Sequence, residues 1–416
     1  MKMYAGIAIV ALVSFDHIIA QSSYRHAAKI VFSDTRVTQL EAQASYPADI
    51  SYLFADLKYR DNEVKICEFG PARRASIASS EVIYGGRTIS MPTPYWPLLW
   101  EYLTRLSVPV WSVGPIDAHF ERCLPTSHRL TSLKALELSQ DFVIRKKNDV
   151  DGRSLAYSGV VVYTHVNRYN STRKQLRTDF KQTYPDILFL DGAAHLYANN
   201  KLELARLLDR PDLQKFKPRW KNYKKQYTPR LAQKILKDIQ ADTVVIKPIN
   251  SSRANGVIIV HASDLDATLK QILAHTLATN HVGGYKNYAP SDKTQTYEYW
   301  KNDPNNAFMV ESFEESKSIR VRGALYDPTM RVVFILRHEA GKIYTTILGG
   351  YWDIPAKHLG DKAASFTDKH KTILMPEGEE SLYMGLKIAE QDFTSVKEVL
   401  YKILPKIYEQ MLSNRR

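Results

Sequence analysis

The stretch 244–260 carries the residue types and spacing best suited to binding an anion. An apolar, β-branched run ends at Lys247, a small polar loop extends from Asn250 to Gly256, and a second apolar run begins at Val257. β-Branched residues favour strands, whereas Asn, Ser and Gly favour turns. A lysine at a strand end and the backbone N–H groups of such a loop can bind the same anion. The segment therefore predicts a strand, a phosphate-covering loop and a second strand.

Two further features flank this segment. Asn199-Asn200-Lys201 precedes it and opens a short amphipathic helix, and 308–315, an apolar run that ends in acidic residues, follows it. Taken in order, the lysine at the helix start, the lysine at the strand end, the flexible loop and the acidic strand end resemble the ATP-grasp superfamily. Most members of that superfamily are carboxylate–amine or carboxylate–thiol ligases. The resemblance covers roughly 195–350.

The resemblance implies which residues hold the phosphates of ATP. Lys201 and Lys247 match the two lysines that contact the phosphates through short, charge-assisted hydrogen bonds. The flexible cover over the phosphates matches a loop that includes Ser251, Ser252, Arg253 and Gly256.

The resemblance also implies contacts to the nucleoside. Glu311 matches the acid that accepts a hydrogen bond from the adenine amino group, and the main chain of Ser312 and Phe313 would contact the adenine ring. Glu314 or Glu315 would bind the ribose hydroxyls. ATP is therefore an implied cofactor, and a carboxylate-bearing molecule is the implied substrate.

Magnesium is the second implied cofactor, and here the chain departs from the family pattern. Those ligases hold the metal with an acid on a late strand and a following Glu-x-Asn pair, which occurs nowhere in this chain. Asp327 is the metal candidate, although ordinary turn chemistry explains the same residue. Arg320 and Arg331 are the catalytic candidates, because an arginine on these strands could stabilise charge on a transferring phosphoryl group.

The implied reaction is the ATP-dependent activation of a carboxylate as an acyl phosphate, which an amine or thiol then attacks. Since the magnesium pair is missing, a phosphotransferase or a nucleotide-binding pseudoenzyme on the same fold stays open. A third hypothesis starts from 215–230, a basic segment with interleaved aromatics of the kind that binds single-stranded nucleic acid. Because no recognised nucleic-acid module surrounds it, a solvated loop between domains is the favoured interpretation, and nucleic acid is the less favoured partner.

The composition limits the class of protein. A chain of 416 residues exceeds one ordinary core, so two or three domains are expected. The formal net charge of +13 attracts acidic ligands such as phosphates, although a solvated basic surface explains it as well. The two cysteines, Cys67 and Cys123, exclude a disulfide-rich scaffold and a zinc site of four cysteines.

The hydrophobic patterns predict a fold of the α+β or α/β class. The expected domains are a small α/β N-terminal domain at 23–190, an ATP-grasp domain at 191–390 and an amphipathic helix at 391–416 that packs on the body. The ATP-grasp fold implies two α+β subdomains that clamp ATP. Pro405 is expected to kink the last helix.

Individual elements follow from local periodicity and turn signals. Strands are expected at 64–70, 108–113, 160–163 and 187–190, and helices at 202–208, 231–239 and 264–277. A β-meander is expected at 319–350, and 349–357 is expected to form a substrate-side loop.

The N-terminal residues 1–22 resemble a secretory signal with cleavage after Ala20, since Lys2 precedes an apolar stretch. Asp16 and His17 interrupt that stretch, and a buried first strand is the alternative. A cleaved signal would mean export, whereas the use of ATP points to the cytoplasm, so the localisation stays open. No other segment is long and apolar enough to span a membrane.

Overall fold

The computed structural model describes a large part of the chain. The described residues are 36–72, 77–78, 90–91, 99, 102–103, 106, 110–113, 129–130, 159–163, 186–198, 200–251, 254–273, 293–355, 357–371 and 384–414. The predicted signal at 1–22 lies outside these ranges, as do Ser252 and Arg253.

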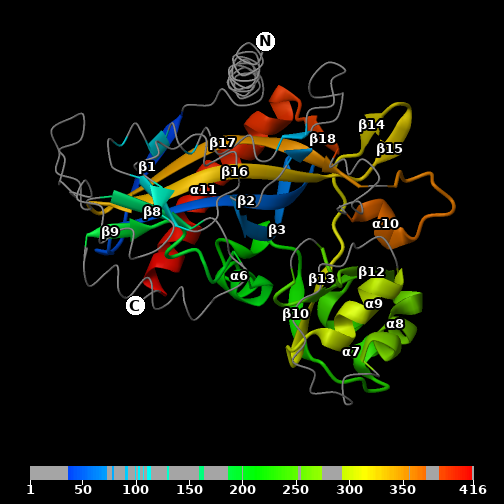
Figure 1. Ribbon diagram of the computed structural model, residues 1–416. Coiled ribbons are helices and arrows are strands. Elements are labelled where there is room, and N and C mark those ends of the chain that lie inside the picture. The colour runs from blue at the N-terminus through cyan, green and yellow to red at the C-terminus, as the bar shows by residue number, and fades with distance from the viewer. Residues whose placement is uncertain are drawn as a thin grey trace, which may run out of the picture.

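A large antiparallel sheet forms the upper body of the molecule (Figure 1). Its strand order is β1–β17–β16–β2–β3. The strand β18 also pairs with β17, along a different stretch of that strand from β1. The strands are β1 (Val37–Glu41), β2 (Asp49–Arg60), β3 (Glu63–Pro71), β16 (Thr329–Glu339), β17 (Lys342–Ile354) and β18 (Met384–Lys387). The sheet therefore combines two hairpins from distant parts of the chain: β2–β3 pairs with the long hairpin β16–β17 through β2 and β16.

One face of this sheet packs on the C-terminal helix α11 (Glu390–Ser413). Alternate residues of β2, such as Leu53 and Leu57, point into this core, as expected for strands whose side chains alternate between faces. They meet an apolar stripe of α11 that includes Leu400, Leu404 and Ile407. The helix continues through Pro405 to Ser413, so the expected packing is present.

A smaller antiparallel sheet forms the second body, with the strand order β10–β13–β11–β12 (Figure 1). Its strands are β10 (Trp220–Lys224), β11 (Thr243–Pro248), β12 (Ile258–His261) and β13 (Ala307–Ser312). Three helices cover one face, namely α7 (Leu231–Ile239), α8 (Leu265–Leu273) and α9 (Lys293–Asn302). The other face is free of these helices and carries the candidate site.

Short elements connect the two bodies. The helix α6 (Lys201–Leu207) and the 3-10 helix η3 (Gln214–Phe216) precede β10, and a second 3-10 helix, η4 (Ala262–Asp264), precedes α8. The hairpin β14–β15 (Ile319–Val321 and Ala324–Tyr326) follows β13, and α10 (Phe366–His370) follows β17.

Two further sheets complete the described strands. One is a parallel sheet with the order β7–β6–β8–β9, and the other is the pair β4–β5. Their bounds are Ile77–Ala78, Ser90–Met91, Val110–Val113, Arg129–Leu130, Gly159–Tyr163 and Ile187–Phe189 for β4 to β9.

The fold is thus a mixed α+β fold whose two larger sheets are antiparallel. The sheet pairing crosses the predicted boundary at residue 190, because β1 to β3 pair with strands from the predicted nucleotide domain. The substrate-side loop expected at 349–357 is wrong over most of its length, since β17 continues to Ile354. Within the described residues, no helix has the length and apolar character needed to cross a membrane.

Candidate functional site

The site is built on the free face of the smaller sheet. Side chains alternate along β11, so Val244 and Ile246 enter the core under the helices, whereas Val245 and Lys247 point to the opposite face. In the antiparallel register Val245 lies opposite Glu311 of β13. Lys247 and Glu311 therefore share a face, and their side chains meet there in an ion pair.

Glu311 is held between two lysines. Its Oε2 accepts a hydrogen bond from the Lys247 ammonium, and its Oε1 accepts one from Lys217. The side chains of Lys217, Glu311 and Lys247 are 2%, 1% and 10% exposed. Two cations and one carboxylate leave a net charge of one positive unit in a region shielded from water. Such a surplus favours binding of an anion.

The ion pairs, rather than burial, decide the charge of Glu311 and Lys247. Burial alone would raise the pKa of Glu311, but the ammonium groups of Lys217 and Lys247 hold that pKa below its ordinary value. Burial alone would lower the pKa of Lys247, and Glu311 more than reverses this effect, so the pKa is raised. Burial does lower the pKa of Lys217, against the pull of Glu311.

Sequence reasoning missed Lys217, because it lies in the basic segment 215–230 among many lysines. In the structure Lys217 ends η3 and is buried, and its ammonium also lies 3.5 Å from the carbonyl oxygen of Cys67 on β3. Lys225 of the same segment is half-buried and pairs with Asp303. The apolar Phe216 directly before the lysine, which packs against the core of the larger sheet, is a local signal for burial.

Lys201 reaches the same site from the start of α6. Asn200 caps this helix with a side-chain oxygen that accepts the N–H groups of Leu202 and Glu203. The Lys201 backbone N–H donates to the carbonyl oxygen of Ile249 at 3.0 Å, and its buried ammonium donates to the carbonyl oxygen of Ser251. The two lysines that the sequence assigns to phosphates therefore lie at one loop.

The loop turns sharply at Gly256, where φ is +70°. An added Cβ would lie 2.7 Å from Pro248 and 2.6 Å from Tyr299, so the position requires glycine on both counts. The Gly256 carbonyl oxygen accepts a hydrogen bond of 2.8 Å from the Trp300 indole. This bond fixes the end of the loop where β12 begins.

An apolar patch lies beside the lysines on the same face. It consists of Val245, Val257 and Ile259, with Phe313 and Phe366 packed against them. These three aliphatic side chains are buried, so they form an apolar cluster next to the buried cations. The main-chain N–H groups of Ser312 and Phe313 donate to Arg219 and Thr243, so only other main-chain atoms of these residues are left for a base.

A cavity of about 580 Å³ lies at the end of β13. It is lined by the tip of the β2–β3 hairpin, by 241–243 and by 313–315. Glu314, the ribose candidate, lies on its wall and accepts a hydrogen bond of 2.7 Å from the Ser312 hydroxyl.

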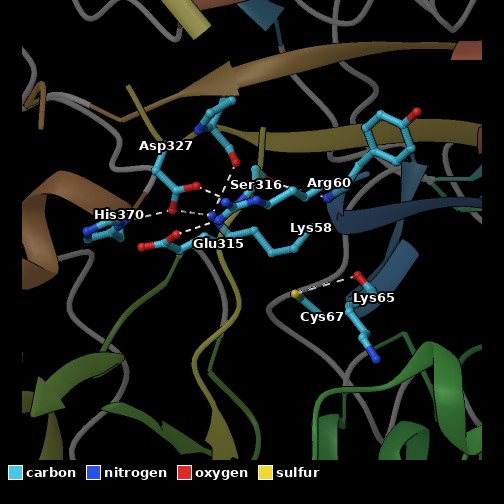
Figure 2. A network of polar contacts seen from close by, with 10 residues as sticks. Lys58, Arg60, Lys65, Cys67, Glu315, Ser316, Asp327 and His370 are labelled. Atoms are coloured by element: carbon cyan, nitrogen blue, oxygen red, sulfur yellow. Dashed lines mark hydrogen bonds and ion pairs between the residues drawn. The ribbon is translucent and has the colours of Figure 1, made fainter. Parts of the chain in front are cut away.

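Asp327, the metal candidate, is instead the centre of a junction (Figure 2). Its Oδ2 accepts hydrogen bonds from Lys58 at 2.8 Å and from His370 at 2.7 Å, and its Oδ1 accepts the Ser316 N–H at 2.6 Å. These contacts join β2, the segment after β13 and α10. Both oxygens of Asp327 therefore have protein partners, and the side chain anchors these three segments to one another.

Both arginine candidates have hydrogen-bond partners of their own. Arg320 is exposed and donates to the Gly323 carbonyl oxygen of its own hairpin at 2.9 Å. Arg331 is bidentate with Asp56, at 2.7 and 2.8 Å, and also contacts the Tyr351 hydroxyl. Its guanidinium is therefore bonded to side chains of the larger sheet.

Asp353 is a buried carboxylate beside Arg331 in the larger sheet. Arg331 Nη2 lies 3.9 Å from its Oδ2, and its Oδ1 has no partner among the described residues. Burial raises the pKa of Asp353 to about 7, although Arg331 opposes this shift. A raised acid pKa means that stability falls as the pH rises from about 4 to 7. We expect Asp353→Asn to be more stable than wild type by roughly 1–3 kcal/mol at pH 8, with a smaller difference at pH 5.

Urea unfolding at the two pH values checks this expectation, with the exposed Asp61→Asn as the control. Equal stability changes for Asp353→Asn at pH 5 and pH 8 would contradict it.

Among the described residues, no group of three or more His, Cys, Asp or Glu side chains is placed to hold a metal ion. Glu68 of β3 is nevertheless well placed beside the lysines. Its Oε2 lies 3.4 Å from the Lys201 ammonium, its side chain is 28% exposed, and Asp56 lies opposite it in the β2–β3 register. Sequence reasoning missed Glu68, because it sought the metal acids after Glu311 and not before it.

Comparisons with known proteins give little that bears on this site. No family model matches the chain, and no curated protein matches it. Solved structures that match include a crystal structure described as "Putative gamma-glutamylcysteine synthetase" from Methylobacillus flagellatus KT, with 10% sequence identity and a TM-score of 0.40. The match covers 89% of this chain and 91% of that chain.

Proposed function

We propose that the chain is an ATP-dependent ligase that activates a carboxylate as an acyl phosphate for attack by an amine or thiol. One observation carries the proposal. Lys201, Lys247 and the loop that ends at Gly256 converge at one end of the smaller sheet, beside a buried carboxylate and an apolar patch. Cations, a backbone loop and neighbouring apolar side chains are the parts that phosphates and a purine ring require.

The proposed chemistry needs little from the protein beyond positioning and charge. A carboxylate oxygen of the substrate attacks the γ-phosphorus of ATP, and ADP leaves with the bond electrons. The amine or thiol then attacks the acyl carbon, loses a proton and expels inorganic phosphate. Lys201 and Lys247 neutralise the phosphate oxygens during the first step, and Glu311 keeps Lys247 charged and in place.

Magnesium would supply further charge neutralisation when bound. An ion that enters with a nucleotide needs only one or two protein carboxylates, because phosphate oxygens and water provide its other ligands. Glu68 meets this need through its partial exposure and its place beside Lys201. Asp56 is the less suitable second acid, because Arg331 occupies both its oxygens.

A nucleotide-binding protein without catalysis is the second candidate. Two observations favour it: the described residues show no group of three or more His, Cys, Asp or Glu side chains placed to hold a metal ion, and Arg320 and Arg331 are each bonded to other partners. The two candidates agree on binding and differ on turnover.

A trapping experiment separates them. We expect Mg·ATP, a set of small carboxylates and hydroxylamine to yield a hydroxamate with equal release of ADP, since hydroxylamine intercepts an acyl phosphate. ATP binding without hydroxamate for any carboxylate in the set would favour the non-catalytic candidate. The Lys247→Met variant is the blank, because it removes the phosphate contact.

A further inference from the structure

Lys371 is a buried lysine that no part of the proposed reaction uses. It follows α10 directly and is 4% exposed. Among the described residues its ammonium has one hydrogen-bond partner, the carbonyl oxygen of Val257, at the long distance of 3.5 Å. A buried ammonium with one weak partner is costly, so a residue of this kind is usually kept for a ligand.

The helix α10 places Lys371 at the edge of the candidate site. The Thr367 hydroxyl accepts the Ile259 N–H and donates to the Ile259 carbonyl oxygen, each at 3.0 Å, which fastens α10 along the outer edge of β12. Phe366 packs into the apolar patch of Val245, Val257 and Ile259. These contacts fix α10, and therefore Lys371, against the nucleotide face.

The strand register shows how near Lys371 lies to Lys247. Ile246 of β11 pairs with Ile258 of β12. One step further in this antiparallel register places Lys247 opposite Val257, the residue whose carbonyl Lys371 contacts. The Lys371 ammonium, next to the Val257 carbonyl oxygen, therefore lies one strand beyond Lys247, at the outer side of the loop end.

We propose that Lys371 is a third phosphate-binding cation of the nucleotide site, brought to the outer side of the loop by α10. The inference rests on the proposed function, because it takes the triphosphate as the ligand. The phosphate completes the hydrogen bonding that Lys371 lacks in the free protein. Lys371 is a binding residue, distinct from the lysines that the sequence pattern identified.

The charged groups around Lys371 agree with this role. Burial lowers the pKa of Lys371 to about 8, and Asp368 of α10 opposes the shift. His370 beside it is bonded to Asp327, Lys247 faces the site from β11, and His261 lies on β12. Among the described residues, no carboxylate forms a hydrogen bond or an ion pair with Lys371. A bound phosphate would supply that negative charge.

Three measurements on the full chain test the inference with Mg·ATP as the probe. We expect Lys371→Met to lower the affinity by about tenfold or more. The same change should leave the free protein as stable as wild type or more stable, because it removes a poorly paired buried charge. Lys369→Met, two residues away in α10, is the matched control and should change neither.

Titration calorimetry in buffers of different ionisation enthalpy supplies the third readout. Above pH 8 the free Lys371 amine is largely neutral, so binding of a phosphate should take up a proton in wild type. This uptake should vanish in Lys371→Met and in Lys371→Arg, and the arginine variant should keep most of the affinity because arginine stays charged.

The outcomes distinguish the inference from the function on which it rests. If wild type binds no nucleotide, the proposed function fails and the inference fails with it. If wild type binds Mg·ATP without proton uptake at pH 9, or if Lys371→Met binds as tightly as wild type, only the inference is overturned. A Lys371→Met variant that loses stability together with affinity would also contradict it. The wild-type proton measurement stands even if a variant fails to fold.

Discussion

Glu311→Gln is expected to destabilise the protein by about 3–5 kcal/mol, the cost typical of breaking a buried ion pair by removing one partner. Glutamine keeps the volume of the side chain and removes its charge. Lys217 and Lys247 would then face each other across a neutral amide, with two buried positive charges and no compensating carboxylate. Chemical unfolding at pH 7 measures the loss.

Glu315→Gln is the matched control for this change. Glu315 lies four residues further along the chain and pairs with Arg60 at 2.8 Å, but both side chains are more than half exposed, at 55% and 56%. Exposed ion pairs contribute at most about 1 kcal/mol. Comparable losses in the free energy of unfolding for the two variants would contradict the expected effect of burial on the Glu311 ion pairs.

The pH dependence gives a second check on Glu311. The pKa of Glu311 is lowered from its ordinary value of 4.5 because Lys217 and Lys247 outweigh the effect of burial. A lowered acid pKa contributes stability that is present above 4.5 and is lost as the pH falls through the folded pKa. The difference between wild type and Glu311→Gln should therefore shrink below pH 4.5. A constant difference down to pH 3 would contradict this.

Lys247→Met is expected to weaken Mg·ATP binding by about 100-fold, or roughly 3 kcal/mol. It removes a charge-assisted contact to phosphate at the start of the loop. Unlike Glu311→Gln, it leaves no buried charge without a partner, because Lys217 and Glu311 remain as a one-to-one pair. The loss of affinity should therefore exceed any loss of stability.

Calorimetric titration measures the affinity of Lys247→Met, and Lys224→Met is its control. Lys224 lies on β10 of the same sheet and is exposed, so its removal changes the overall charge by the same amount without touching the site. Equal affinities for the two variants would remove Lys247 from the phosphate site.

Local sequence patterns predict those parts of the site that each lie within one short stretch of chain. The β-branched run before Lys247 predicts β11, the loop composition predicts the turn at Gly256, and the apolar run before Glu311 predicts β13. The helix at 231–239 also has the expected bounds. These features depend on neighbours a few residues away, which a single sequence displays.

Features that depend on contacts between segments far apart in the sequence could not be predicted from it. No local pattern shows that β2 pairs with β16, since strand register is fixed by burial in the whole sheet. Glu68 therefore could not be placed beside Lys201. The partners of Asp327 at Lys58 and His370 are equally remote in sequence, which is why a turn aspartate resembled a metal ligand. Burial of Lys371 likewise follows only from the docking of α10 on β12.

The most direct test of the nucleotide site is the melting temperature of the wild-type protein with and without Mg·ATP. Nucleotide at about 100 times its dissociation constant should add about 2.7 kcal/mol to the free energy of unfolding, which gives a clear rise in melting temperature. We predict that rise for wild type and its loss in Lys247→Met. An unchanged melting temperature for wild type at millimolar Mg·ATP would contradict the account.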